Sequence, residues 1–552
     1  MPYPYQQPVF TGLDKAGDLV ATHLVAAAPF VMVDLLAIDP NGQLLVGTDP
    51  QTNRIRCRHG KVSESVGGLL HGIVEVRIEI NLVEAELARP VLVYIFPVAH
   101  TIRCIGKRRN GMALQVHVEV EEQIDTYEPA DNGAGPLWCH GCSVIARRQD
   151  EVFAVGLETL AGEVPLNNTR WVLYHRRDDG EWKVIHRDDG RTREPSPIAL
   201  LTDDLLVSAN PTQAASGKYG GAAEPVVFRF DTTDLEHEPT SQQPDWVGDP
   251  SFRDHSYRTF IGDATTGQAL YMQNEGYDVA HLSFLNAGQW HGRGVIRWPF
   301  GDGYAKPQPL RLCYPNVQLR DGVAHFLGVG DIVEPVDAWR EAKKKITGRD
   351  WDYVFRRLFY SRSQPLTQQA NDPFGSWLEL ANRDETAGAT RNCDLWVDPQ
   401  ERAHLMWIEI TTDHRIRDEF FPGVEIRHSL EYAIIVDERV EHRRTLATLG
   451  EEEEGPTPHL ARFHEITPGH AVIVAQFSTD QGPEYRLGEL PGHTESLAEE
   501  MTWAPIPFAR PMSGTFLTNT VRGGSNPSTT LDLVGSIDGP ALGYARVRIE
   551  AT

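Results

Sequence analysis

The sequence lacks several features that would place it in a large class of proteins. No run of about 18 apolar residues occurs among its 552 residues, which excludes a transmembrane helix. The net charge of −25 argues against a basic face for nucleic-acid phosphates and disfavours an anionic membrane surface. The start, MPYPYQQPVF, lacks the basic-then-apolar order of a signal peptide. We therefore expect a chain that is cytoplasmic as written, or secreted or periplasmic if a leader was removed, with neither nucleic acid nor membrane as a partner.

Cysteine is scarce as well. Six cysteines are too few for a disulfide framework in a chain of this length. Cys139 and Cys142 form a CHGC motif, half of a zinc or redox site, but no second CxxC occurs. We expect these thiols to be buried and inert. No metal ligand is assigned and no cofactor is expected to be required, although a divalent cation (calcium or zinc) near His140 stays an open alternative.

What the sequence has in abundance is one repeated pattern. An apolar stretch, a short turn rich in Asp, Gly or charge, and a second apolar stretch recur seven times, roughly 55 to 80 residues apart. The copies begin at His140, Pro195, His255, Cys313, Cys393, His459 and Thr530. Hairpins repeated in this way are typical of a β-propeller, in which each repeat is one blade. The sequence therefore predicts an all-β fold, a seven-bladed β-propeller over residues 137–552.

Residues 1–130 do not follow this pattern. In runs such as GIVEVRIEINLVEAEL and ALQVHVEVEEQI, apolar and polar residues alternate and β-branched residues are frequent, which is typical of strands. The segment TYEPADNGAGP has the composition of a linker. We expect a small β-sandwich-like accessory domain here, with the alternative that a first strand completes the last blade. Between the fourth and fifth repeats, AWREAKKKI predicts a helix that ends at Gly348.

Propeller geometry selects candidate site residues. The innermost strand of a blade runs first and the next one returns, so residues before the first and after the second strand open on one face. Of these positions we expect proton-transfer or anion-binding roles for His140, His255, Tyr257 and Arg258, because His, Tyr and Arg are suited to this chemistry. The positions and loops of this face also supply eight expected substrate-binding residues: Asn168, Arg170, Asn274, Tyr314, Asn316, Glu334, Arg427 and His428.

Three further motifs accompany the repeats: WCHG at Trp138 to Gly141, N-x-x-W at Asn168 to Trp171, and TLDLVGSIDG near the C-terminus. With them, residues 137–552 resemble the BNR-repeat propellers of carbohydrate metabolism, in particular the seven-bladed ulvan-lyase-like group and related glycosidases. The resemblance implies catalysis by histidines, a tyrosine and an arginine that line the funnel, which is the central opening around which the blades are arranged. It places His140 and Tyr257 at the proton-transfer positions and requires Arg258 or Arg427 on the substrate carboxylate. An early Arg-Ile-Pro element, which sialidases need, is absent from the sequence.

The resulting expectation is an enzyme that cleaves uronate-containing oligo- or polysaccharides by β-elimination in the funnel. The first alternative is a glycoside hydrolase on the same scaffold, with its acids drawn from Glu158, Asp331, Glu334, Asp394 and Glu409. The second is a non-catalytic glycan-binding propeller, since a fold does not determine a function. The sugar, the linkage and the oligomeric state do not follow from the residues.

Overall fold

The computed structural model describes residues 114–177, 180–490 and 501–551, together with seven strands before them. The chain forms two compact units, Met1–Met112 and Ala113–Thr552. In the first, a five-stranded sheet has the order β1-β2-β7-β6-β5, and β3 pairs with β4. These strands are β1 (Leu24–Ala27), β2 (Phe30–Val33), β3 (Leu45–Asp49), β4 (Arg54–His59), β5 (Val74–Asn81), β6 (Ala88–Ile95) and β7 (Ile102–Gly106). The packing expected of an accessory domain lies outside the described residues, so that domain stays a prediction.

The second unit contains seven four-stranded antiparallel sheets. Their first strands are β9 (Ile145–Arg148), β13 (Ile198–Leu201), β17 (Thr259–Asp263), β23 (Leu312–Arg320), β29 (Ala389–Val397), β33 (Thr457–Thr467) and β37 (Ser513–Thr518). Each of these contacts the next, and β37 contacts β9. A closed ring of first strands is the centre of a propeller, so the predicted seven blades are confirmed.

The remaining strands complete the blades outward. The second strands are β10 (Glu151–Thr159), β14 (Asp204–Ala209), β18 (Gln268–Glu275), β24 (Val323–Gly330), β30 (Ala403–Ile410), β34 (His470–Thr479) and β38 (Thr530–Ile537). The third are β11 (Thr169–Arg177), β15 (Val226–Asp231), β19 (Val279–Asn286), β27 (Arg357–Arg362), β31 (Arg427–Val436), β35 (Gly482–Glu489) and β39 (Ala541–Ala551). The outer strands of the first six blades are β12 (Lys183–Arg187), β16 (Thr240–Gln242), β20 (Gln289–Arg297), β28 (Leu378–Asn382), β32 (Arg439–Gly450) and β36 (Trp503–Ile506).

The seventh blade is closed by a strand from the other end of the chain. Its outer strand is β8 (Leu114–Thr126), which pairs antiparallel with β39 along its length. The domain boundary expected near residue 130 therefore lies between Met112 and Ala113. β8 fits the alternative stated from the sequence, in which a strand before the first repeat completes the last blade. Its partner β39 lies more than 400 residues away.

The cores between blades are apolar, because the alternating residues of each strand face a neighbouring blade. Trp171 and Trp407 are fully buried among them. Burying one such large side chain contributes about 1.5 to 3 kcal/mol. No helix among the described residues is long and apolar enough to cross a membrane.

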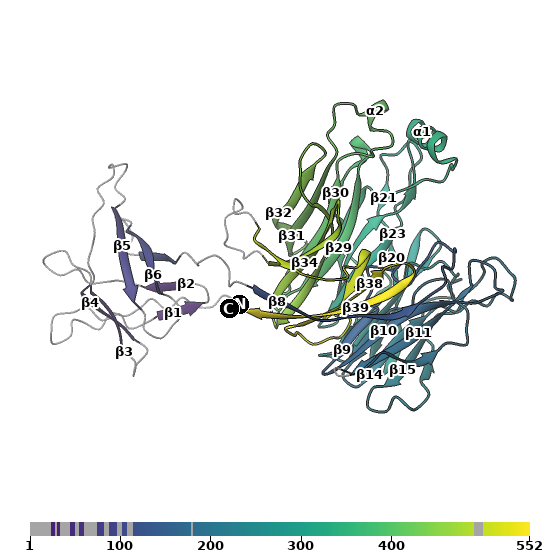
Figure 1. The fold of residues 1–552 in the computed structure, drawn as a ribbon, viewed down its shortest axis with the longest axis horizontal. Helices are drawn as coiled ribbons and strands as arrows, with labels where there is room; N and C mark the ends of the chain where they lie inside the picture. The colour runs from purple at the N-terminus through teal and green to yellow at the C-terminus, as the bar shows by residue number, and fades with distance from the viewer. Residues whose placement is uncertain are drawn as a thin grey trace. The chain divides into compact units, whose positions relative to one another are not determined.

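We call the end at which the innermost strands begin the front face. Connections from a blade's second to its third strand also lie there. One of them carries α1 (Asp337–Thr347), which ends at Gly348 (φ 71°) as predicted. Another carries α2 (Arg417–Phe420), and the two helices lie close together, with the rings of Trp339 and Phe421 5.3 Å apart (Figure 1). Short elements complete the list: β21 (Phe300–Gly301), β22 (Gln308–Pro309), β25 (Ile332–Val333), β26 (Tyr353–Val354) and a 3-10 turn at Asp384–Thr386.

Candidate functional site

The front face gathers side chains from all seven blades at the starts of the innermost strands. We call the following set the front-face cluster: Trp138, His140, Glu194, His255, Tyr257, Arg311, Tyr314, Arg391, His459 and Thr515. Contacts described below join seven of them into one group and Arg391, His459 and Thr515 into a second. Arg391 lies near enough to His140 to lower its pKa. A set contributed by every blade is positioned by the rigid ring of strands rather than by one flexible loop.

The centre of the cluster is aromatic. Trp138 stacks on Tyr257 with ring centroids 4.8 Å apart. Tyr314 meets both rings edge-on, at 5.4 and 5.3 Å. His140 stacks on Tyr314 at 4.5 Å, and His255 lies 4.6 Å from Tyr257. The predicted residues His140, His255, Tyr257 and Tyr314 are thus brought into one group.

Two of these rings sit on a backbone in an unusual conformation. Tyr257 has φ 40° and Tyr314 φ 49°, in the left-handed region that bulky residues rarely adopt. Each such residue costs about 1 to 3 kcal/mol, and such strain concentrates at functional sites. The conformation of Tyr314 is fixed from two sides. Its carbonyl accepts a hydrogen bond from Asn392 Nδ2 at 2.6 Å and lies against Gly141, where a Cβ atom would be only 2.3 Å from it.

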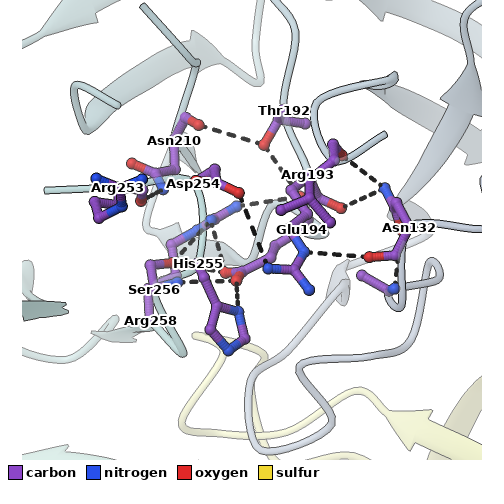
Figure 2. Close-up of polar contacts among 12 residues, drawn as sticks. Asn132, Thr192, Arg193, Glu194, Asn210, Arg253, Asp254, His255, Ser256 and Arg258 are labelled. Carbon is purple, nitrogen blue, oxygen red and sulfur yellow. Dashed lines mark hydrogen bonds and ion pairs between the residues drawn. The ribbon is translucent and has the colours of Figure 1, made fainter. Parts of the chain in front are cut away.

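A buried carboxylate orients His255. Glu194 Oε1 accepts hydrogen bonds from His255 Nδ1 at 3.0 Å and from the Ser256 amide at 2.9 Å, and Oε2 accepts one from Ser256 Oγ at 2.6 Å. Burial acts to raise the pKa of Glu194, but the hydrogen bonds and charges of His255 and Arg258 outweigh it and lower it to about 2. The ionised carboxylate holds the proton of His255 on Nδ1 and leaves Nε2 facing away from the network (Figure 2).

The two arginines expected on a substrate carboxylate lie elsewhere. Arg258 is fully buried, where it donates to the carbonyl of Pro195 at 2.5 Å and pairs with Glu194 at 3.5 Å (Figure 2). Its position is therefore beneath the site, supporting Glu194. Arg427 forms ion pairs with Glu425 at 3.0 Å and Glu453 at 3.1 Å. Neither guanidinium is available to the aromatic centre, because each already satisfies carboxylates of the chain.

A third arginine, Arg391, occupies the position that these two do not. Its Nη1 lies 3.4 Å from His459 Nε2, and its Nη2 donates to Thr515 Oγ1 at 3.2 Å. Gln476 Oε1 receives the Nδ1 proton of His459 at 2.7 Å, which leaves Nε2 to accept from Arg391. Within the described ranges Arg391 pairs with no carboxylate. Burial lowers the pKa of Arg391, so this cation is partly desolvated without a counter-charge from the chain.

His140 is buried near this cation and is held in the neutral form. Burial, and then the charges of Arg391, Arg462 and Arg522, hold its pKa well below the usual range. Arg462 Nη2 donates to the backbone carbonyl of His140 at 2.9 Å, which fixes the residue. Its Nδ1 has no hydrogen-bond partner among the described residues. A polar atom buried without a partner costs about 1 to 3 kcal/mol, and such an atom is a candidate ligand contact.

The pKa values of Tyr257 and Tyr314 are shifted upward, opposite to the shift of His140. Burial raises the pKa of both phenols far above the usual value, with the nearby charge of Asp331 adding to the effect. The two hydroxyls therefore keep their protons and serve as donors. At neutral pH His140 is therefore neutral and the two tyrosines are protonated. The same shifts make the imidazole a weaker base and the phenols weaker acids than in free solution.

The structure gives three other predicted residues structural partners. Asn168 donates to the carbonyl of Ala130 at 2.7 Å and so fixes the segment before the first blade. Arg170 forms an ion pair with Glu158 at 3.0 Å. Asn316 is fully buried and accepts from Asn392 Nδ2 at 2.5 Å. All three lie in or near the front face but outside the aromatic centre.

Three more predicted substrate-binding residues differ in burial and in hydrogen-bond partners. Glu334 is fully buried and ion-paired with Lys343 at 2.8 Å and with Arg356. The Asn274 amide is buried, with neither its nitrogen nor its oxygen paired among the described residues. His428 is half-buried, and burial lowers its pKa. Of the three, Asn274 has unused hydrogen-bonding capacity.

The remaining expected acids are all bound to arginines. Asp331 pairs with Arg311, and Glu409 pairs with Arg443 at 2.7 Å. Similarly, Asp394 Oδ1 lies 2.8 Å from Arg522. The Oδ1 atom of Asp331 is buried without a partner in the described part of the chain. Within that part, no group of three or more His, Cys, Asp or Glu side chains is placed to hold a metal ion.

Six members of the cluster were given no catalytic or binding role from the sequence: Trp138, Glu194, Arg311, Arg391, His459 and Thr515. A signal for three of them was present. Glu194 directly precedes the repeat at Pro195, Arg311 lies two residues before the repeat at Cys313, and Arg391 lies two before the repeat at Cys393. The position rule that selected His140 and His255 would have selected these too if it had been extended by two residues.

No protein-family model and no curated protein matches the chain. Solved structures that match include a Penicillium chrysogenum α-L-arabinanase complexed with arabinobiose, at 11% identity, a TM-score of 0.39, and coverage of 79% of this chain and 98% of that one. A Trypanosoma rangeli sialidase matches at 8% identity and TM-score 0.33, covering 67% and 58%. A prolyl endopeptidase matches at 10% identity and TM-score 0.36, covering 74% and 50%. At these values the matches assign no activity, and likeness to the ulvan-lyase-like group rests on the sequence motifs alone.

Proposed function

We propose that this chain is a carbohydrate-active enzyme that cleaves an acidic glycan at the front-face cluster. The observation that carries the proposal is the partly desolvated guanidinium of Arg391, which has no carboxylate partner in the described ranges and lies among His140, His459 and Tyr314. A partly buried cation without a counter-charge favours an anionic ligand group, because a charge-assisted hydrogen bond then replaces the lost hydration.

The aromatic centre supports a sugar as the rest of the ligand. Trp138, Tyr257 and Tyr314 combine apolar ring faces with polar tips, and a sugar offers apolar C–H faces and hydroxyls in the same way. The half-exposed Trp138 and Tyr314 are accessible from the front face. A carboxylate on Arg391 would place the ring of a uronate-type sugar against these side chains.

β-Elimination uses the cluster as follows. Arg391 stabilises the charge that develops on the sugar carboxylate as the adjacent C–H proton leaves. Neutral His140 takes this proton. The C–H electron pair forms the C4–C5 double bond while the C4–O4 bond breaks. Tyr257 or Tyr314, which retain their protons, donate one to the leaving oxygen.

Hydrolysis is the second candidate, and it is the reaction class that the names of the matched arabinanase and sialidase denote. One observation favours it: Asp331, whose charge acts on Tyr257, has a buried oxygen without a partner in the described part of the chain. Glu194 is connected to Tyr257 through His255. A carboxylate pair is what a glycosidase needs to activate water and protonate the leaving group.

The test is incubation with a panel of acidic and neutral glycans while two signals are recorded. A rise in absorbance near 235 nm reports the new double bond of elimination, whereas new reducing ends without this rise report hydrolysis. Arg391→Met is expected to abolish either signal on acidic glycans. Arg427→Met is the matched control, because Arg427 is already paired with Glu425 and Glu453. Binding without either signal would identify a non-catalytic glycan-binding propeller, and no binding at all would refute the proposal.

A further inference from the structure

A chain of contacts leads from the aromatic centre outward to the edge of the front face. Arg311 lies between two tyrosines, with its guanidinium 4.7 Å from the ring centroid of Tyr257 and 4.1 Å from that of Tyr277. The Tyr277 hydroxyl is 3.4 Å from the hydroxyl of Tyr353. Because Tyr257 contacts Tyr314 and Trp138, these contacts run without interruption from the candidate catalytic residues to the surface.

The outer members of this chain of contacts, and Trp351 two residues before Tyr353, are unusually exposed for aromatic side chains. Tyr277 is 55% exposed, Tyr353 38% and Trp351 57%. Tyr277 lies in the turn between β18 and β19, and the other two flank Asp352 just before β27. We call these three residues the rim platform. Exposed large aromatic groups that are not needed for packing mark binding surfaces.

The platform is held rigidly from below. Asp352, between Trp351 and Tyr353, pairs with Arg415 at 2.9 Å and with the buried Lys343 at 3.3 Å. Its carbonyl accepts from the Glu334 amide at 2.8 Å. Val354 is buried in the apolar core between blades. The backbone of the platform is thus fixed, so binding loses little conformational entropy.

We propose that the rim platform is a distal subsite that binds a second sugar ring of the same glycan chain, so that the enzyme's substrate is an extended oligo- or polysaccharide. This inference rests on the proposed function and adds the length of the substrate to it. Arg311 is neutralised by Asp331, so the platform offers ring faces and hydroxyls rather than net charge. A sugar ring continuous with the one at Arg391 fits this chemistry and this path.

The experiment combines affinity electrophoresis in gels that contain acidic polysaccharides with kinetics on fragments of two to eight sugars. It compares wild type with Tyr277→Ala, Trp351→Ala and Tyr353→Ala. The Tyr219→Ala variant is the control, because Tyr219 is exposed on another loop of the front face and has no ring contact among the described residues. Each platform variant removes one ring, and we expect its affinity for the polymer, read from the retardation, to fall about tenfold. The KM for long fragments should rise while kcat/KM for disaccharides stays unchanged.

The outcomes separate this inference from the proposed function. Retardation that is lost in the platform variants but kept in Tyr219→Ala supports the subsite, even if no cleavage is seen. Equal retardation of all variants, or cleavage that does not depend on fragment length, refutes the subsite and leaves the proposed function standing. Absence of both retardation and cleavage in wild type refutes both.

Discussion

The imidazole of His140 lies nearly flat on the ring of Tyr314, with the planes 21° apart and the centroids 4.5 Å apart. Tyr314 is itself held in a left-handed conformation by Asn392. The strained tyrosine therefore fixes the plane of the His140 ring. Orientation of this kind is what a proton acceptor needs before a substrate arrives.

His140→Gln is expected to lower kcat about 10²- to 10⁴-fold on any substrate that wild type cleaves, because a general base contributes by this amount. The thermal midpoint should change little, since Nδ1 makes no hydrogen bond that the variant would lose. Kinetics and differential scanning fluorimetry check the two statements. The exposed His237→Gln serves as control. A kcat within threefold of wild type would remove His140 from the mechanism.

Arg391→Met is expected to raise the stability of the free protein while it weakens the binding of acidic ligands. The cation is partly desolvated without a carboxylate partner in the described ranges, so a volume-matched apolar side chain relieves an electrostatic cost. Loss of a charge-assisted hydrogen bond, about 1.5 to 3 kcal/mol, corresponds to a roughly 10- to 150-fold weaker affinity. Urea unfolding and calorimetric titration measure both. A destabilised variant with unchanged affinity would contradict the prediction.

The fold and the face of the site were predictable from the sequence because both depend on local pattern. Repeated hairpins fix the number of blades, and position at the starts of the innermost strands places His140, His255, Tyr257 and Tyr314 at the front face. Their mutual contacts follow from this placement.

Which arginine is free to bind a ligand was not predictable, because that depends on tertiary partners. Arg258 and Arg427 meet acids that lie far away in sequence or in a separate turn. Arg391 meets His459 and Thr515 instead. The pairing of β8 with β39 could be stated from the sequence only as an alternative, because the local pattern of β8 does not identify a partner at the opposite end of the chain.

Because His325 is buried, we expect the protein to lose stability when the pH falls from 7 to 5. Burial, and then Arg362 and Arg320, lower its pKa from 6.5 to about 3, while the unfolded chain keeps the ordinary value. Below pH 6.5 the unfolded state therefore binds the extra proton, so stability falls as the pH falls, by at most about 1.4 kcal/mol per pH unit. The contribution of Glu194, whose pKa is about 2, is lost only below 4.5 and does not enter this range.

Urea unfolding at both pH values isolates this contribution. His325→Gln should lose about 1 to 2 kcal/mol less than wild type between pH 7 and pH 5, because the glutamine does not titrate. The exposed His237→Gln should behave as wild type. Equal losses in His325→Gln and wild type would show that His325 takes up no proton on unfolding.

Lys343 on α1 is expected to be essential for stability. It is 1% exposed and binds Glu334 at 2.8 Å, Asp413 at 3.1 Å and Asp352 at 3.3 Å. Lys343→Met leaves these carboxylates with one cation fewer in a buried place, which costs about 3 to 5 kcal/mol. The neighbouring Lys344→Met should change the free energy of unfolding by less than about 0.5 kcal/mol, because Lys344 is 44% exposed and pairs only weakly. Similar values for both variants in urea unfolding would contradict a structural role for the network.

Two N-terminal deletions test how the propeller is closed. Removal of residues 1–112 leaves β8 in place and should preserve the cooperative unfolding of the propeller. Removal of residues 1–127 takes away the strand that pairs with β39, together with the ion pair of Glu122 and Arg176 at 2.6 Å. The uncovered edge of β39 is then a site for pairing with other chains. We expect the second deletion to lower the thermal midpoint by several degrees and to promote aggregation, measured by scanning fluorimetry and light scattering. If both deletions gave the same midpoint and remained monomeric, the pairing of β8 with β39 would not be what closes the ring.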